Sequence, residues 1–110
     1  MTQPDVPRQA KAMIDAINAA DTDAFVDSFT VDGFVSDWGT VKSGREGVRS
    51  WADSDAIGAG ARMTVLSATT DGTTTRVRFG WTSSVFNGES DGIFEVDGEK
   101  LASFTIPPSH

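Results

Sequence analysis

The chain has 110 residues, of which 38% are hydrophobic and 23% charged, with nine basic and sixteen acidic residues and a formal net charge of −7. This length favours a single domain, residues 1–110, with one buried core. Because the basic residues are scattered along the chain, neither nucleic acid nor an anionic membrane surface is an expected partner.

The residue types that carry much of enzyme chemistry are absent or nearly so. The chain has no cysteine and no tyrosine, and its one histidine is the C-terminal His110, either native or a tag remnant. A serine–histidine–aspartate triad, a cysteine–histidine pair and a histidine-based metal site are therefore excluded. We expect neither a metal nor a cofactor, and an acid–base residue would have to be Asp, Glu or Lys.

The sequence also bears on where the protein resides. No apolar run approaches the roughly 20 residues that a membrane span needs. Residues 1–5 lack the basic and apolar regions of a signal peptide. We therefore expect a cytoplasmic protein.

Two helices are predicted before residue 30. Residues 4–20 carry apolar side chains at helical spacing, and Met13 and Ile17 lie on the apolar face. Asp21-Thr22-Asp23 is typical of a helix start, because short polar side chains accept hydrogen bonds from the first free N–H groups. The helix that follows should cover about two turns.

A strand, a return strand and a third helix are predicted next. Residues 31–33 are interpreted as a turn and residues 34–38 as a strand that places Val35 and Asp37 on one face. Residues 41–43 can pair back onto it. Gly44 then begins a helix with Val48 and Trp51 on its buried face, and residues 57–60 are interpreted as a flexible link.

From residue 62 the apolar pattern changes to a period of two, which is typical of strands. Asp71-Gly72, Asn87-Gly88 and Asp97-Gly98 are hairpin signals, so four strands should form an antiparallel meander. Helices come first and strands last, which predicts an α+β fold with helices over one face of the sheet.

Five stretches of the chain together resemble one known family: residues 18–25, 29–33, 37–39, 43–48 and 96–101. The chain resembles the nuclear transport factor 2-like (NTF2-like) superfamily, and within it the polyketide-cyclase-like (SnoaL-like) branch. The Gly44-Arg45-Glu46 helix start and its spacing from the preceding strand are the more specific part of this pattern.

The resemblance implies a cone-shaped α+β fold, in which a curved antiparallel sheet wraps around the N-terminal helices and leaves an apolar pocket open at one end. It also implies a homodimer, which we expect to form through the sheet. Members of the superfamily include ketosteroid isomerases, polyketide cyclases, epoxide hydrolases, dehydratases and proteins without a known activity, so the fold alone does not choose a function.

Asp37 is the predicted catalytic residue. The resemblance places it where ketosteroid isomerases carry their general base, after the first strand and before the Gly-Arg-Glu helix. The alternation of the strand agrees, because Asp37 is inside if Val35 is inside. A carboxylate that loses hydration in an apolar pocket becomes a better proton acceptor near neutral pH. The alternative is that Asp37 caps a turn or faces solvent at the strand end.

The rest of the isomerase machinery has no match. The tyrosine of its oxyanion hole would fall near Met13, and Asp91 is the nearest residue to its second, protonated acid. Steroid isomerisation is therefore not expected, because the donors that stabilise the enolate are missing. Polyketide cyclases need only an acid–base carboxylate in an apolar pocket, which is closer to this sequence.

Epoxide hydrolases of the superfamily use an Asp-Arg-Asp arrangement. Arg76 or Arg78, with Asp37 and Asp91, would mimic part of it. The alternation of the strand, however, puts both arginines on the face opposite Phe79, where a solvated sheet surface or a dimer contact is the simpler interpretation.

A small apolar molecule is the predicted ligand. The apolar residues expected to line its pocket, unless they only fill the core, are Met13, Ile17, Trp38, Trp51, Phe79, Trp81 and Phe94. Phe86 and Phe104 could line the pocket or fill the core, since periodicity does not distinguish the two. Two hypotheses stay open. One is a cofactor-free cyclase or isomerase with Asp37 as base, and the other is a non-catalytic ligand-binding or dimeric interaction module.

Overall fold

The computed structural model describes residues 5–84 and 86–107. Over these residues the chain forms three α-helices, one short 3₁₀ helix and a six-stranded sheet. The elements in chain order are α1 (Arg8–Asn18), α2 (Thr22–Asp27), β1 (Phe29–Asp37), β2 (Thr40–Ser43), α3 (Gly44–Asp55), η1 (Ile57–Ala59), β3 (Arg62–Asp71), β4 (Thr74–Thr82), β5 (Asn87–Asp97) and β6 (Lys100–Ile106).

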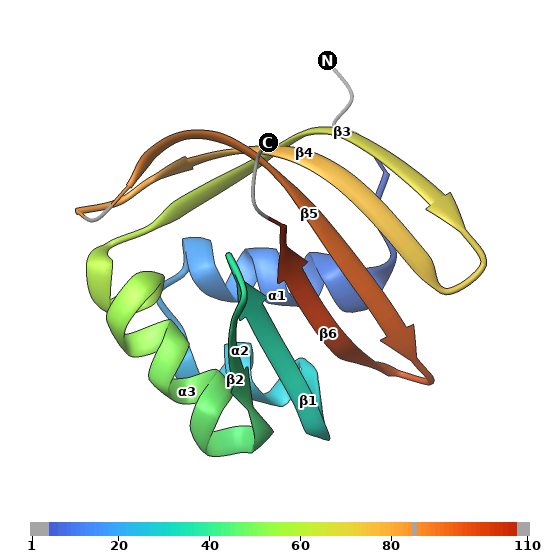
Figure 1. Ribbon diagram of the computed structural model, residues 1–110, viewed down its shortest axis with the longest axis horizontal. Helices are drawn as coiled ribbons and strands as arrows, with labels where there is room; N and C mark the ends of the chain where they lie inside the picture. The colour runs from blue at the N-terminus through green and yellow to red at the C-terminus, as the bar shows by residue number, and fades with distance from the viewer. Residues whose placement is uncertain (1–4, 85, 108–110) are drawn as a thin grey trace.

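The sheet is strongly curved and does not close on itself. Its strand order is β2-β1-β6-β5-β4-β3, antiparallel throughout except that β1 and β6 run parallel. Figure 1 shows the long strands β3 to β5 arching over α1, while α3 lies beside β1 and β2. This is the predicted α+β arrangement of a curved sheet around helices, and the β3–β6 meander is confirmed.

The first two helices form for the reasons that the sequence indicates. Met13 and Ile17 are fully buried on the apolar face of α1, and the helix begins at Arg8, after Pro7, instead of near residue 4. The Asp21 side chain caps α2 by accepting a hydrogen bond from the backbone N–H of Ala24 at 3.1 Å. Both predicted helices are therefore present.

Helix α3 is fixed to α2 by packing and by charge. The rings of Trp51 and Phe25 stack with centroids 5.8 Å apart. On the surface, Arg45 donates to Asp27 at 2.7 Å, and this hydrogen bond, with the positive charge behind it, lowers the pKa of the Asp27 carboxyl. These contacts set the position of α3 relative to α2, and α3 carries part of the site described below.

Three local predictions are wrong. Residues 31–33 do not turn the chain, because β1 continues from Phe29 to Asp37 with an irregularity in its pairing that absorbs the extra residues. Asn87-Gly88 is not the β4–β5 turn but the start of β5, where the Asn87 amide donates to the Ser83 carbonyl at 3.0 Å. Residues 57–59 form a 3₁₀ helix and not a flexible link.

The two faces of β4 differ as the alternation predicts. Val77, Phe79 and Trp81 are buried on the concave side, whereas Arg76 and Arg78 are exposed on the convex side. Among the helices of residues 5–84 and 86–107, none is long and apolar enough to cross a membrane.

Gly92 allows two core rings to pack directly against the backbone of β5. A Cβ atom at this position would lie 2.8 Å from Phe104 Cε1 and 3.0 Å from Phe79 Cε1. Gly80, on the neighbouring strand β4, is the matched control, because a Cβ there would meet only the Thr64 carbonyl oxygen at 4.0 Å.

We predict that Gly92→Ala lowers the free energy of unfolding by about 1–3 kcal/mol, since the added methyl group overpacks the core. Gly80→Ala should cause no loss. Urea unfolding followed by tryptophan fluorescence measures both. Equal effects of the two substitutions would show that the packing at Gly92 is not the tight contact described.

Candidate functional site

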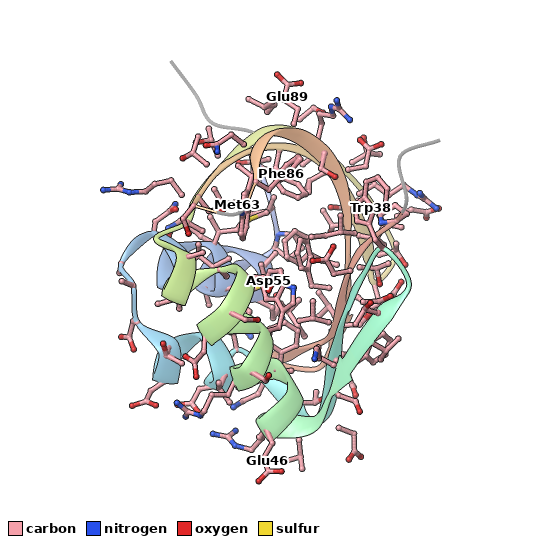
Figure 2. The ribbon with its side chains drawn as sticks, turned by 60° about the vertical axis from the view of Figure 1, so that its left-hand side comes forward. Trp38, Glu46, Asp55, Met63, Phe86 and Glu89 are labelled. Atoms are coloured by element: carbon pink, nitrogen blue, oxygen red, sulfur yellow. The ribbon has the colours of Figure 1, made fainter. Side chains whose placement is uncertain are left out.

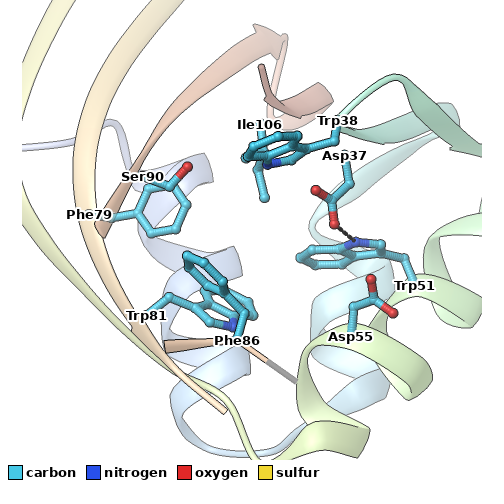
Figure 3. Close-up of a pocket in the computed structure, with 9 residues that line it drawn as sticks. All are labelled: Asp37, Trp38, Trp51, Asp55, Phe79, Trp81, Phe86, Ser90 and Ile106. Atoms are coloured by element: carbon cyan, nitrogen blue, oxygen red, sulfur yellow. Dashed lines mark hydrogen bonds between the residues drawn. The ribbon is translucent and has the colours of Figure 1, made fainter. Parts of the chain in front are cut away.

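A cavity of about 260 Å³ opens between α3, the end of β1 and the concave side of β4 and β5 (Figure 3). The residues that line it are Asp37, Trp38, Trp51, Asp55, Phe79, Trp81, Phe86, Ser90 and Ile106. In Figure 2, Trp38, Asp55 and Phe86 lie around one region between the sheet and α3, whereas Glu46 lies at the other end of that helix. The cavity is therefore at one end of the domain, and its wall is mostly aromatic.

Asp37 ends β1 and projects into this cavity. It shares the inner face of the strand with Val35, which is fully buried, and Asp37 itself is half-buried. Its Oδ2 accepts a hydrogen bond from the indole Nε1–H of Trp51 at 3.1 Å. No hydrogen bond to Oδ1 occurs within the described part of the chain, so one carboxylate oxygen is held and the other is open to a ligand.

The residue after Asp37 has an unusual backbone conformation. Trp38 and Gly39 form the two-residue loop of the β1–β2 hairpin with φ values of 52° and 89°. Such a loop favours Asn-Gly, and a bulky residue in the left-handed region costs about 1–2 kcal/mol. The Trp38 side chain is nevertheless placed there, 52% exposed, at the mouth of the cavity.

The tryptophans deeper in the cavity are fixed by their neighbours. The Trp51 ring lies 5.9 Å from that of Trp81 and 6.2 Å from that of Phe104, measured between centroids. The Trp81 Nε1–H donates to Ser83 Oγ at 3.2 Å. With both indole N–H groups occupied, these two residues present ring faces and edges to the cavity, on a rigid frame.

Two further polar side chains reach the cavity from different walls. Asp55 lies one turn after Trp51 on α3, and its Oδ1 accepts from Ser54 Oγ at 2.7 Å. Ser90 is buried on the inner face of β5, and its side chain makes no hydrogen bond with any described residue. Figure 3 shows Ser90 on the opposite side of the cavity from Asp37.

The structure brings together only part of the predicted site. Trp38, Trp51, Phe79 and Trp81 line the cavity together with Asp37. Met13, Ile17 and Phe94 lie instead in the fully packed core, because α1 fills the concave face of the sheet away from the open end. The catalytic role of Asp37 stays a prediction.

Of the two phenylalanines whose role the sequence left open, Phe86 lines the cavity and Phe104 is fully buried in the core. Three lining residues were not predicted: Asp55, Ser90 and Ile106. Two of these could have been found from their spacing, because Asp55 follows Trp51 by four residues on a helix and Ser90 precedes the inward-facing Phe94 by four residues on a strand. Ile106 is at the end of the last strand, where periodicity does not separate a cavity wall from the core.

The arginines and the other candidate acid lie elsewhere. Arg78 pairs on the convex face with Asp91 at 3.1 Å and with Glu89 at 3.4 Å. The hydrolase-like arrangement of Arg76 or Arg78 with Asp37 does not occur, because the sheet separates them. Within the described ranges, no cluster of three or more His, Cys, Asp or Glu side chains could hold a metal ion.

Comparison with known proteins gives matches in structure but not in sequence. No protein-family model and no curated protein matches the chain. A cystatin-fold protein from Novosphingobium aromaticivorans superposes with a TM-score of 0.77, at 25% identity over 90% of this chain and 94% of that one. A candidate polyketide cyclase from Sinorhizobium meliloti gives a TM-score of 0.80, at 24% identity over 92% and 94%.

A third similar structure is SalBIII, described as an epoxide hydrolase/cyclase-like enzyme with a role in pyran ring formation in the polyether salinomycin. It gives a TM-score of 0.78, at 18% identity over 91% of this chain and 87% of SalBIII. Each superposition covers nearly the full length of both chains, so the similarity extends over the whole domain and is not limited to one motif. The chain therefore has the cystatin-like, or NTF2-like, α+β fold, and the fold that the resemblance of its sequence implies is confirmed.

Proposed function

We propose that the protein binds a small, mainly apolar organic molecule in this cavity and acts on it as a cofactor-independent isomerase or cyclase, with Asp37 as the general base. The observation that carries the proposal is the Asp37 carboxylate in the wall of an aromatic cavity, held there by the Trp51 indole N–H. A positioned carboxylate beside an apolar ligand is the arrangement that proton abstraction from carbon requires.

The proposed reaction step uses three side chains. The free Oδ1 of Asp37 takes a proton from a carbon next to a carbonyl group, while the Trp51 N–H keeps the carboxylate in place through Oδ2. The electron pair of the broken C–H bond moves onto the carbonyl oxygen. Ser90, on the opposite wall, donates its hydroxyl hydrogen to that oxygen as negative charge develops. Return of the proton to another carbon gives an isomer. Alternatively, the enolate carbon attacks a second carbonyl carbon of the same molecule, the π bond of that carbonyl breaks, and its oxygen takes the proton back from Asp37, which closes a ring.

The size of the cavity limits the ligand. A volume of about 260 Å³ lies below the range of roughly 300–1,000 Å³ that is usual for drug-sized ligands. A compact molecule of one or two rings is therefore the better fit, in keeping with the expectation that steroid isomerisation does not occur. The described activities of SalBIII and of the candidate cyclase from Sinorhizobium meliloti belong to those proteins, and they support the proposal by showing which chemistry this fold is associated with.

We predict that the protein accelerates hydrogen–deuterium exchange at the carbon next to the carbonyl of 2-tetralone, a compact apolar ketone. Asp37→Asn should reduce this exchange by about 10²-fold or more, because an amide cannot accept the proton. Asp32→Asn is the matched control, since Asp32 is an exposed residue of the same strand. Proton NMR in D₂O measures the exchange rate, and thermal unfolding checks that both variants fold.

Equal exchange rates in the wild type and Asp37→Asn would remove Asp37 from the mechanism. If 2-tetralone quenches tryptophan fluorescence but no exchange is accelerated, the non-catalytic alternative holds, in which the cavity binds its ligand without chemistry.

The role of Ser90 is tested separately. We predict that Ser90→Ala lowers the exchange rate of 2-tetralone by about 10–100-fold while the dissociation constant changes little, because the hydroxyl acts mainly on the developing enolate. Ser103→Ala is the control, since Ser103 is equally buried on the neighbouring strand β6 but does not line the cavity. A parallel rise of the dissociation constant in Ser90→Ala would mean that the hydroxyl only binds the ground state.

The expected homodimer through the sheet also stays a prediction. The convex face of the sheet is the surface proposed for it, and Ile93 lies there near the charged Arg78 and Asp91. Sedimentation velocity should give a mass of twice the 11.7 kDa chain, and Ile93→Asp should shift the protein to the monomer if this face is the interface. An unchanged dimer in that variant would place the interface elsewhere.

A further inference from the structure

We propose that the ligand of this cavity carries a positive charge, as a protonated amine or quaternary ammonium group on a compact apolar frame, and that Asp55 is the carboxylate that pairs with it. This inference rests on the proposed function only in assigning the ligand to this cavity. It names the chemical class of that ligand and gives Asp55 a role distinct from that of Asp37.

The first argument is the charge of the cavity wall. Two of the nine lining residues, Asp37 and Asp55, are carboxylates, and none is a lysine or arginine. Neither carboxylate forms an ion pair with a described basic residue. The nearby arginines of α3 are directed elsewhere: Arg45 pairs with Asp27 and Arg49 with Asp23 on the surface between α2 and α3. Within residues 5–84 and 86–107, no basic side chain therefore pairs with either of the two acids.

The second argument is the aromatic lining. Five of the nine residues are aromatic, and three of these are tryptophans. Tryptophan gives the strongest cation–π attraction, and cages of aromatic rings are the recurring way in which proteins recognise ammonium groups. Figure 3 shows the two carboxylates on either side of the Trp51 indole, so a cation on the Asp55 side of this ring would meet both the aromatic surface and the Asp55 carboxylate.

The third argument concerns the end of α3. Asp55 is the last residue of this helix, and the last turn carries no basic residue. The C-terminal end of a helix is the negative end of its dipole, where a cation is favoured and a carboxylate is disfavoured. A positively charged ligand beside Asp55 would offset both the dipole and the side-chain charge.

Desolvation decides between a neutral and a charged ligand. A neutral molecule that filled the cavity would remove water from the carboxylates and offer no charge in return, which is unfavourable. An anion would add repulsion. An ammonium group replaces the lost water with a charge partner. Trp51 occupies Oδ2 of Asp37 and Ser54 occupies Oδ1 of Asp55. Asp55 can therefore hold the cation through its Oδ2, while Oδ1 of Asp37 acts as the base.

The test uses two compounds that share a ring system and differ in charge. 2-Aminotetralin is protonated at neutral pH, and 2-tetralol is its neutral counterpart of nearly the same shape. By isothermal titration calorimetry at low salt, the wild type should bind the amine about tenfold more tightly than the alcohol. The preference should shrink in 0.5 M salt, because added ions screen charge.

Asp55→Asn should remove most of this preference by weakening the binding of 2-aminotetralin. It should not weaken the binding of 2-tetralol, because the variant has one charged group fewer to desolvate. Asp53→Asn is the matched control, because it removes the same charge from the same helix at an exposed residue outside the cavity, and it should keep the preference. Thermal unfolding verifies that both variants are folded.

Equal affinities of the wild type for the amine and the alcohol would overturn the inference while leaving the proposed function intact. A loss of affinity for both compounds in Asp55→Asn would give Asp55 a structural role and overturn it as well. If the wild type binds none of 2-aminotetralin, 2-tetralol and 2-tetralone, the assignment of a compact ligand to this cavity fails, and the proposed function fails with it.

Discussion

The placement of Trp51 is the constraint on which the rest of this domain depends. Its ring packs against Phe25 of α2, Trp81 of β4 and Phe104 of β6, and so joins the helical layer to the concave face of the sheet. Its indole N–H points the other way and holds Asp37. One buried side chain thus combines the packing that a small domain needs with the orientation of a carboxylate. An indole can do both because its apolar rings pack in the core while its single N–H group donates a hydrogen bond.

The cavity exists because the cone is filled from one end only. Helix α1 and the phenylalanines of β5 and β6 pack the interior away from the mouth, where Met13, Phe94 and Phe104 are completely buried. At the open end, α3 and the end of β1 lie across the cavity from β4 and β5, and aromatic side chains form a wall without filling the space. The left-handed backbone of Trp38 lies at this mouth. Backbone strain of this kind persists where the surrounding structure fixes it, and it is concentrated at sites that bind or react.

Much of the fold followed from local patterns. The helical period of α1, the Asp21 cap of α2 and the alternation of β4 were each strong enough to predict the element and its buried face. Two of the failures are residues typical of turns that lie inside strands. Residues 31–33 fall in the irregular stretch of β1 between the residues that pair with Leu101 and Ser103 of β6, so β1 takes up the extra residues without turning. Asn87 and Gly88 pair with Thr82 and Trp81 of β4, and this pairing outweighs their local preference for a turn.

Part of the candidate site was likewise predictable from the sequence, and part was visible only in the structure. The sequence by itself determined that Asp37 shares a strand face with Val35, that Trp51 lies on the buried face of its helix, and that no cysteine is available, because these depend on periodicity and composition alone. Only the tertiary structure decided that Phe79 and Trp81 border a void whereas Met13, Ile17 and Phe94 do not, and that Asp55 and Ser90 join Asp37 there. The physical reason is that the apolar period of a helix or strand shows only which of its sides is buried. Whether a void remains depends on how closely separate elements pack. That packing is set by the shapes of side chains that are far apart in the chain.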